Sequence, residues 1–447
     1  MIIEHLLNMF DQYGEKEAII WNEQSYSYRW LCRKTREWQE FLQDYDIGSA
    51  RVVALEGDYS PFICSMLFAL IGNNHVVVPL STTVTPEEKK EFLKLANVQC
   101  VMRFNNLNEL IKEDYSYEPD HPLIRELIKH EKPGLVLFSS GSTGKSKGIV
   151  HDLTVLLDKY QKKGKGLRSL VFLLLDHIGG INTLFSILSS GGTMIVQNSR
   201  NPSDICYAIE KHRVELLPTT PTFLNLLILS EAYKEYDLSS LKMITYGTEP
   251  MPELTLKKAT EIFPGIQFKQ TYGLSELGIV GTRSESDSSL WVQLGGKGFT
   301  YKIVHDILWI KAETSMLGYL NAPCPFDEEG WFNTQDVVLQ KDGYIKILGR
   351  ETEIINVGGQ KVYPAEVENV LMELDNIRDV SVRGEQNPIM GSIVSAKVNL
   401  LEPEELQNLK RRIRLHCLER LESYKIPIKI ELTEESLFGE RFKKMRR

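Results

Sequence analysis

The sequence has few cysteines, only short apolar runs and no excess of positive charge. Its six cysteines are scattered without a Cys-x-x-Cys pair, which argues against a disulfide framework or a cysteine zinc site and favours reduced thiols. The apolar run at residues 170–175 ends at Asp176, far short of the roughly 20 residues that span a membrane. A net charge of −8 gives no electrostatic support for nucleic-acid binding. The first residues do not have the pattern of a signal peptide, in which a basic segment precedes an apolar one. Together these absences predict a cytoplasmic protein with no membrane span.

The 447 residues are too many for one ordinary domain and enough for a large buried core. Strand and helix signals alternate over the first hundred residues. Residues 52–55 and 76–78 are apolar runs typical of strands covered on both faces, and Pro61 begins a helical pattern between them. Thr85-Pro86-Glu87-Glu88 has the form of a helix capping box. This alternation predicts an α/β fold.

Residues 134–148, GLVLFSSGSTGKSKG, are the most informative stretch. They predict a buried strand, then a loop of small and hydroxyl side chains with two lysines. Ile149, Leu153, Leu156 and Tyr160 recur at helical spacing, so we expect a helix after the loop. Backbone N–H groups, hydroxyls and lysines in such a loop suit the binding of a polyphosphate.

Two kinds of phosphate loop come into question. A Walker loop, GxxxxGK[ST], fits Gly144, Lys145 and Ser146, but Ser139 stands where its first glycine belongs. The loop of the adenylate-forming superfamily reads [ST]-G-[ST]-T-G-x-x-K-G and is matched at every fixed position. Those positions include Ser140, Gly141, Ser142, Thr143, Gly144 and Lys147. The stretch therefore resembles that superfamily, which includes acyl- and aryl-CoA synthetases and peptide-synthetase adenylation domains.

Further motifs follow in the order found in that superfamily, and acyl- and aryl-acid ligases are the most similar members. The motifs are Gly247-Thr248-Glu249-Pro250, Tyr272-Gly273-Leu274-Ser275-Glu276, a G-W-F-x-T-x-D segment ending at Asp336, and a strand ending at Arg350. The resemblance implies that Gly247, Thr248, Glu249 and Tyr272 contact adenine, and that Ser275 contacts the α-phosphate. It also implies that Glu276 binds Mg²⁺ and that Asp336 and Arg350 contact the ribose.

The resemblance also implies where the acid binds. His177, in Asp-His-Ile-Gly-Gly, matches a position beside the substrate carboxylate. Amino-acid-activating relatives place an aspartate next, whereas Ile178 follows here and cannot pair with an ammonium group. Strand alternation predicts that Asp176 points to the opposite face. We therefore expect a fatty or aromatic acid without an α-amino group.

Residues 351–447 resemble the small, mobile α+β C-terminal domain of the superfamily, and residues 1–350 its large N-terminal adenylation domain of α/β subdomains. The resemblance implies a hinge at Thr352 and a thiol tunnel at Gly358 and Gly359. The final G-K-x-x-R loop places the catalytic lysine at Lys443, with Phe442 in the glycine position. A displaced register would place it at Lys444.

The resemblance implies an AMP-forming acid–thiol ligase that uses ATP and Mg²⁺. The expected catalytic residues are Lys443, Glu276 and His177, and the acceptor is CoA or the phosphopantetheine of a carrier protein. Two alternatives stay open: a P-loop kinase or NTPase, and a catalytically impaired protein that binds ATP or an adenylate. Gln335, Thr352 and Phe442 depart from the superfamily pattern, and these departures keep the second of these alternatives open.

Overall fold

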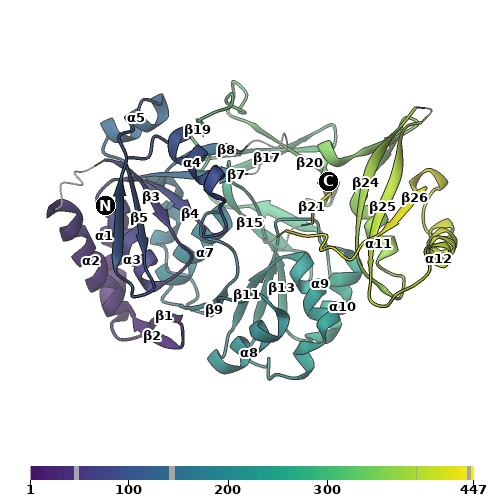
Figure 1. Ribbon diagram of the computed structural model, residues 1–447, viewed down its shortest axis with the longest axis horizontal. Coiled ribbons are helices and arrows are strands. Elements are labelled where there is room, and N and C mark those ends of the chain that lie inside the picture. The colour runs from purple at the N-terminus through teal and green to yellow at the C-terminus, as the bar shows by residue number, and fades with distance from the viewer. Residues whose placement is uncertain (1, 45–49, 140–145, 389, 440–443, 447) are drawn as a thin grey trace.

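The computed structural model describes residues 2–44, 50–139, 146–388, 390–439 and 444–446, and its strands form four sheets (Figure 1). Most of the first sheet is parallel. In spatial order it contains β13 (Gln267–Gln270), β12 (Met243–Tyr246), β11 (Leu216–Thr219), β9 (Arg168–Val171), β10 (Thr193–Val196), β1 (Glu17–Trp21) and β2 (Gln24–Ser27). Only the β1–β2 pair is antiparallel among these described strands.

The second sheet has a parallel centre and antiparallel edges. Its order is β19 (Gly318–Tyr319), β8 (Lys147–Asp152), β7 (Gly134–Ser139), β4 (Val76–Leu80), β3 (Val52–Glu56), β5 (Cys100–Phe104) and β6 (Leu110–Asp114). Its central strands β3 and β4 are rich in buried β-branched residues, as the sequence predicts for strands covered on both faces.

Helices between these two sheets share the largest buried cluster. Phe10 of α1, Phe68 of α3 and Phe185 of α7 form successive edge contacts there, with ring centroids 5.7 and 5.5 Å apart. The helices of this part of the chain are α1 (Ile2–Tyr13), α2 (Tyr28–Asp44), α3 (Pro61–Gly72), α4 (Pro86–Leu95), α5 (Pro122–Lys129), α6 (Leu153–Leu156), α7 (Ile178–Ser189), α8 (Pro202–His212), α9 (Pro221–Ser230) and α10 (Glu253–Ile262). The capping box predicted at Thr85 is present at the start of α4.

The third sheet is antiparallel throughout its described pairs. It contains β14 (Tyr272–Leu274), β15 (Gly278–Ser284), β16 (Val292–Gly295), β21 (Tyr344–Arg350), β20 (Phe332–Lys341), β18 (Ile307–Ala312) and β17 (Phe299–Val304). Because β14 and β21 belong to one sheet, residues almost 80 positions apart in the chain reach the same site.

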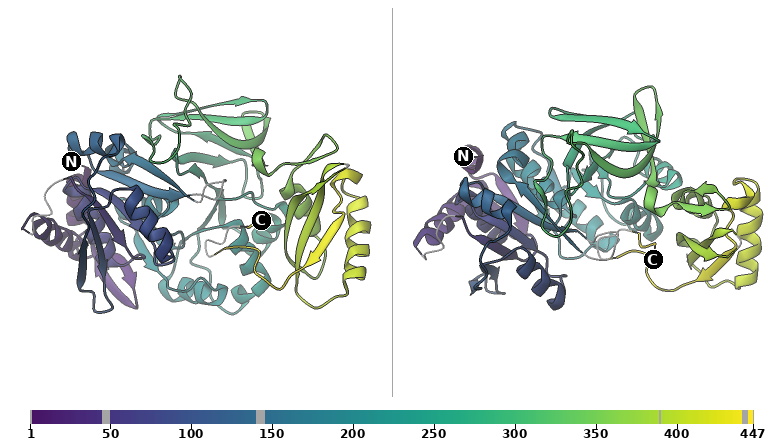
Figure 2. Two further views of the ribbon diagram at one scale, coloured as in Figure 1. Left: turned by 45° about the horizontal axis from the view of Figure 1, so that its top comes forward. Right: turned by 90° about the horizontal axis from the view of Figure 1, so that it is seen from above.

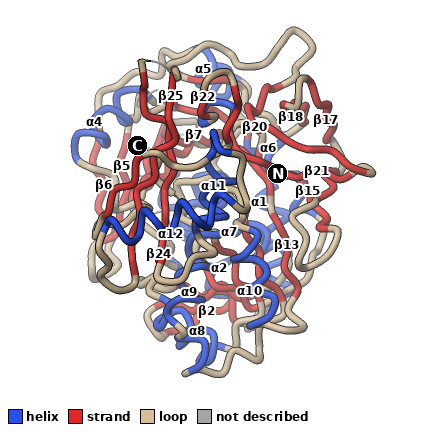
Figure 3. Tube along the Cα trace, turned by 90° about the vertical axis from the view of Figure 1, so that its right-hand side faces the viewer, coloured by secondary structure: helices blue, strands red, loops and turns tan. Residues whose placement is uncertain are grey.

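The last part of the chain forms a separate sheet and core. Its strands are β22 (Ile355–Val357), β23 (Gln360–Val362), β24 (Ile377–Asn387), β25 (Gly391–Leu400) and β26 (Lys429–Leu432), and its helices are α11 (Pro364–Leu371) and α12 (Leu406–Leu418). Figure 3 views the molecule from this side, with α11 and α12 in front. The predicted boundary between residues 350 and 351 falls between β21 and β22.

The described residues that follow β26 leave this C-terminal sheet, and Lys444–Arg446 lie towards the larger part of the molecule, as both views in Figure 2 show. Lys444 pairs with Phe438 in an isolated antiparallel bridge on the way. Within the described residues, no helix is long and apolar enough to cross a membrane.

The segment after the phosphate loop corrects the sequence analysis. Residues 147–152 form β8, which pairs antiparallel with β7, and only a single helical turn, α6, follows. The spacing of apolar residues from Ile149 suggested a helix with one buried face. Val150, His151 and Asp152 are buried too, so this segment has no exposed face and the spacing carries no information. The loop therefore joins two strands of a hairpin and does not precede a helix N-terminus.

Candidate active site

Tyr272, Asp336 and Arg350, which come from three of the sequence motifs, form one hydrogen-bonded cluster. The Tyr272 hydroxyl donates to Asp336 Oδ2 at 2.5 Å, and Arg350 Nε lies 2.9 Å from Asp336 Oδ1. Asp336 and Arg350 are register partners on β20 and β21. Burial, and then the charge of Asp336, raise the pKa of Tyr272, so its hydroxyl stays a donor. The cluster presents a fixed carboxylate, the kind of acceptor that hydroxyl donors need.

Thr334 supports this cluster and is a residue that the sequence analysis left without a role. Its hydroxyl donates to Leu308 O at 2.7 Å and accepts from Asp336 N at 3.0 Å, while its carbonyl accepts from Arg350 Nη1 at 2.8 Å. The next residue, Gln335, has a φ of 60°. Glycine adopts this left-handed backbone most readily, and glutamine occupies it here.

A second group joins the phosphate-loop hairpin to the Tyr272–Glu276 motif. Lys147 Nζ lies 4.9 Å from the centroid of the Tyr319 ring, and the Tyr319 hydroxyl donates to Glu276 Oε1 at 2.7 Å. Burial and the Glu276 charge raise the pKa of Tyr319, so this hydroxyl also remains protonated. Tyr319 lies on β19, next to β8, and its place in a Gly-Tyr pair was the only sequence signal for it.

The described end of the phosphate loop is held by Asn321. Its side chain accepts from Gly148 N at 3.1 Å and donates to Ser146 O at 2.8 Å. Five predicted ATP-binding residues lie outside the described part of the chain, so the structure assigns them no position. They are Ser140, Gly141, Ser142, Thr143 and Gly144.

His151 fixes the backbone next to Glu276. Its Nε2 lies 2.6 Å from Ser275 O, and this ring nitrogen must donate because a carbonyl only accepts. Burial lowers the pKa of His151 to about 4, so the ring is neutral at pH 7. Ser275, predicted to contact the α-phosphate, is therefore held through its main chain.

The Gly247–Glu249 turn makes contacts that the motif did not predict. A Cβ on Gly247 would lie 2.4 Å from Thr271 Oγ1, so only glycine fits there. Glu249 Oε1 accepts from both Thr222 N and Thr222 Oγ1, at 2.8 and 2.5 Å. Its other oxygen accepts from Lys444 N at 3.0 Å. Glu249 thus joins the start of α9 to the C-terminal tail.

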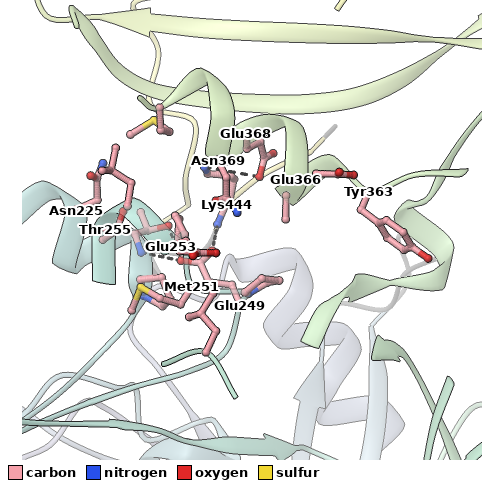
Figure 4. Close-up of a pocket in the computed structure, with 18 of the residues that line it drawn as sticks. Asn225, Glu249, Met251, Glu253, Thr255, Tyr363, Glu366, Glu368, Asn369 and Lys444 are labelled. Carbon is pink, nitrogen blue, oxygen red and sulfur yellow. Dashed lines mark hydrogen bonds and ion pairs between the residues drawn. The ribbon is translucent and has the colours of Figure 1, made fainter. Parts of the chain in front are cut away.

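Figure 4 shows the pocket around this contact, between α9, α10 and α11. Its volume is about 830 Å³, and both Glu249 and Lys444 line it. Lys444 Nζ lies 3.1 Å from Asp379 Oδ1 and 3.9 Å from Glu368 Oε2. Burial alone would lower the pKa of Lys444, but Glu368 and Asp379 raise it. Lys443, the predicted catalytic residue, lies outside the described residues.

Arg446 anchors the same tail to helix α11 and to the short 3₁₀ turn that contains Glu353. It donates from Nε and Nη2 to the two oxygens of Glu368 at 3.0 and 2.8 Å, and from Nη1 to Glu353 Oε2 at 2.6 Å. Burial would raise the pKa of Glu368, but Lys444 and Arg446 hold it below its ordinary value. Four carboxylates, those of Glu249, Glu353, Glu368 and Asp379, therefore hold Lys444 and Arg446 near the end of the chain.

The profile of the AMP-binding enzyme family matches residues 8–300, and the profile of the AMP-binding enzyme C-terminal domain matches residues 366–437. The chain belongs to the AMP-binding enzyme family. This AMP-binding enzyme is 26% identical to an indoleacetate–CoA ligase from Aromatoleum aromaticum, over 94% of this chain and 92% of that protein. It is also 26% identical to a 2-succinylbenzoate–CoA ligase from Bacillus subtilis, over 76% of this chain and 71% of that protein.

The fold is also that of a solved structure. The anthranilate CoA ligase AuaEII superposes with a TM-score of 0.81 at 19% identity, over 99% of this chain and 95% of that chain. The expected α/β architecture, with a large N-terminal and a smaller C-terminal domain, is thereby confirmed. The assignment to adenylate-forming enzymes is confirmed by the family match.

In this AMP-binding enzyme, His177 immediately precedes α7 at its N-cap position, and Ile178 begins the helix and is buried. The prediction that Asp176 points away from His177 is wrong. Strand β9 ends at Val171, so alternation does not reach Asp176, and its Oδ1 lies 3.7 Å from His177 Nε2. Asp176 therefore stands beside His177 and contacts its ring.

The expected thiol-tunnel glycines have a local structural role. Gly358 and Gly359, at φ values of 58° and 87°, form the two-residue turn between β22 and β23, in which Val357 pairs with Gln360. This geometry favours a Gly-Gly turn without reference to a thiol. Thr352 lies in a short 3₁₀ turn between β21 and β22.

The residues present suit a magnesium ion shared with a nucleotide. The described residues contain no group of three or more His, Cys, Asp or Glu side chains able to hold a metal alone. Mg²⁺ commonly takes one or two protein carboxylates and completes its shell with substrate phosphates and water. Glu276, oriented by Tyr319, is one such carboxylate.

Proposed function

We propose that this AMP-binding enzyme activates a carboxylic acid with ATP, releases pyrophosphate, and passes the acyl group from the adenylate to the thiol of CoA. The observation that carries the proposal is the cluster of Tyr272, Asp336 and Arg350. It gathers three motif residues into one site, suited to the hydroxyls of a ribose. The CoA ligases among its relatives support CoA as the acceptor in preference to a carrier protein.

Each group has a task in this proposal. Asp336 and Arg350 hold the ribose, the Gly247–Glu249 turn and Tyr272 border the adenine, and Lys147 neutralises phosphate charge. Glu276 would hold Mg²⁺, which screens the phosphate charge when it is bound. The acid's carboxylate attacks the α-phosphate, and the protein contributes mainly orientation and charge stabilisation.

The acid-binding site follows from His177 and Ile178. We propose that His177 lies beside the reacting carboxylate and that Ile178 borders the acid. Asp176 Oδ1 lies 3.7 Å from His177 Nε2, so Asp176 stands next to this ring. Ile178 itself offers an α-ammonium group no acceptor, and a buried ammonium left without one costs on the order of several kcal/mol. We therefore expect acids without an α-amino group to be the substrates.

The hairpin geometry of β7 and β8 speaks against a P-loop kinase or NTPase. A Walker loop leads from a strand into a helix whose N-terminus faces the phosphates, whereas this loop leads into an antiparallel strand. Asn321 and Tyr319 from β19 and its flank support the hairpin from outside the loop.

The test is acid-dependent exchange of labelled pyrophosphate into ATP, with panels of aromatic, fatty and amino acids. We expect exchange with aromatic or fatty acids and background with amino acids. His177→Ala should lower the exchange rate with the preferred acid more than it weakens ATP binding. ATP binding without exchange for any acid would favour an impaired binding protein and contradict the proposal.

A further inference from the structure

Lys159 makes an unusual pair of contacts between two of the motif-bearing segments. It lies in the short 3₁₀ helix of residues 158–161, and its ammonium donates to Asn182 Oδ1 at 3.0 Å and to Ile279 O at 3.4 Å. Asn182 lies on α7 and Ile279 on β15. Lys159 thus connects the helix that follows His177 to the strand that follows Glu276.

Both oxygens are neutral, and the structure describes no carboxylate in ion-pair contact with this ammonium. Asn182 Oδ1 already accepts from the Tyr160 hydroxyl at 2.7 Å. The Lys159 side chain is accessible, yet the surrounding protein lowers its pKa to about 8. The ammonium also lies over the Tyr160 ring, 5.0 Å from its centroid. A lysine ammonium has three N–H donors, so the contacts with Asn182 and Ile279 leave one for an anionic ligand.

The position of Lys159 relative to the expected acid site suggests which ligand that is. Asn182 is five residues beyond His177, a rise of about 7.5 Å along a helix. Ile279 is three residues beyond Glu276. An acid whose carboxylate lies at His177 and whose chain follows α7 would bring its far end near Lys159.

We propose that the acid substrate carries a second carboxylate at its far end and that Lys159 binds it. The proposal rests on the proposed function, because it extends the same acid site. A second carboxylate would receive charge-assisted hydrogen bonds from Lys159, and Asn182 and Ile279 would orient the ammonium. An acid with an apolar end would desolvate Lys159 without pairing it, so the site would discriminate against that acid.

The experiment compares dicarboxylic acids with monocarboxylic acids of the same carbon skeleton in pyrophosphate exchange. The panel contains linear and aromatic pairs of increasing length, and kcat/KM is measured for each. We expect at least one dicarboxylate to exceed its matched monocarboxylate by tenfold or more. Lys159→Met should lower that ratio by at least tenfold, whereas Lys159→Arg, which keeps the charge, should retain most of the preference.

Lys163→Met is the matched control, because Lys163 is a nearby lysine whose ammonium lies over the Tyr13 ring, 5.0 Å from its centroid. We expect the ratio to be the same in this variant as in the parent enzyme. Equal use of each acid pair by the parent enzyme, or a ratio that Lys159→Met leaves unchanged, would overturn the role of Lys159. The absence of exchange with every acid would instead contradict the proposed function.

Discussion

Lys444 and Lys443 are neighbours, but the contacts of Lys444 argue that it is an anchor. Its ammonium is held by Asp379 and Glu368, and its N–H by Glu249. A lysine that must approach a reacting phosphate cannot keep both carboxylates. We therefore keep Lys443 as the proposed catalytic residue. The displaced register, which would give this role to Lys444, is the less favoured alternative.

We predict that Lys443→Ala abolishes acid-dependent pyrophosphate exchange and changes the ATP dissociation constant by only a few fold, because a lysine that contacts mainly the transition state affects rate more than binding. Lys444→Met should instead lower the melting temperature, since Asp379 loses its buried cation, at a cost of about 3 kcal/mol. Exchange and thermal melting are measured on both variants. An active, normally folded Lys443→Ala together with an inactive Lys444→Met would show that the register is displaced.

His151 gives the protein a defined dependence of stability on pH. Its pKa falls from 6.5 to about 4 on folding, so the folded state binds this proton less tightly than the unfolded chain. The stabilising contribution is complete above about pH 6.5 and is lost as the pH falls towards 4. At pH 5 the loss is about 2 kcal/mol. His75, whose pKa burial also lowers to about 4, adds a similar dependence.

His151→Gln should reduce this dependence, because glutamine can donate to Ser275 O but does not titrate. The measurement is the melting temperature of the parent and the variant at pH 7 and pH 5. We expect the melting temperature to fall less between pH 7 and pH 5 in the variant than in the parent. His75 is present in both proteins, so its contribution is the same in both. An equal fall in the two proteins would show that His151 is not the titrating group.

At the scale of elements, the phosphate-loop hairpin shows what the sequence could and could not predict. The residues of the loop were sufficient to propose phosphate binding, because that depends on local chemistry. The element after the loop was not predictable from the spacing of Ile149, Leu153 and Leu156, because β8 is covered on both faces and loses the alternation of a strand. For the same reason Asp176 was misplaced: an apolar run does not show where its strand ends.

The hairpin leads to a prediction about the two lysines of the loop. Lys147 is on β8 and faces Tyr319, which contacts Glu276. We expect Lys147→Ala to lower exchange on the order of a hundredfold, the scale for loss of one charge-stabilising donor. Lys145→Ala should have at most an equal effect.

The nucleotide product provides the complementary measurement for this element. Chromatography of the reaction with acid and CoA should show AMP and pyrophosphate. ADP and phosphate as the acid-dependent products, with Lys145 indispensable and Lys147 replaceable, would favour a Walker loop. Lys129→Ala is a suitable control, since Lys129 ends α5 and belongs to no motif of the site.

At the scale of the whole molecule, the order of the motifs predicted the fold better than any single element did. The motif residues Tyr272, Asp336 and Arg350 are far apart in the sequence, and the superfamily order was enough to expect them in one site. Thr334, Tyr319 and Asn321 were missed because their roles arise from pairing between β18, β19, β20 and β8, which one sequence does not display. The contact between Glu249 and the tail was missed for the same reason.

Among the described residues, two hydrogen bonds join the tail and the C-terminal sheet to the larger part of the molecule. Lys444 N donates to Glu249 Oε2 at 3.0 Å, and Asn225 Nδ2 donates to Arg378 O at 3.3 Å. These contacts bring the residue next to Lys443 to the Gly247–Glu249 turn. We propose that this arrangement serves acid activation and that both contacts break when the C-terminal part rotates for thiol transfer, as the family resemblance implies.

Cross-linking tests this proposal. With the exposed Cys324 changed to serine, Asn225→Cys and Arg378→Cys are joined by a short reducible bismaleimide-type linker. We expect the linked enzyme to retain pyrophosphate exchange, because the activating arrangement is preserved, and to form acyl-CoA at less than a tenth of the unlinked rate. Cleaving the linker should restore the second reaction, and each single-cysteine variant treated in the same way controls for chemical modification. Unimpaired acyl-CoA formation by the linked enzyme would show that both reactions use the arrangement seen in the structure. Loss of exchange would show instead that the arrangement seen in the structure does not serve activation.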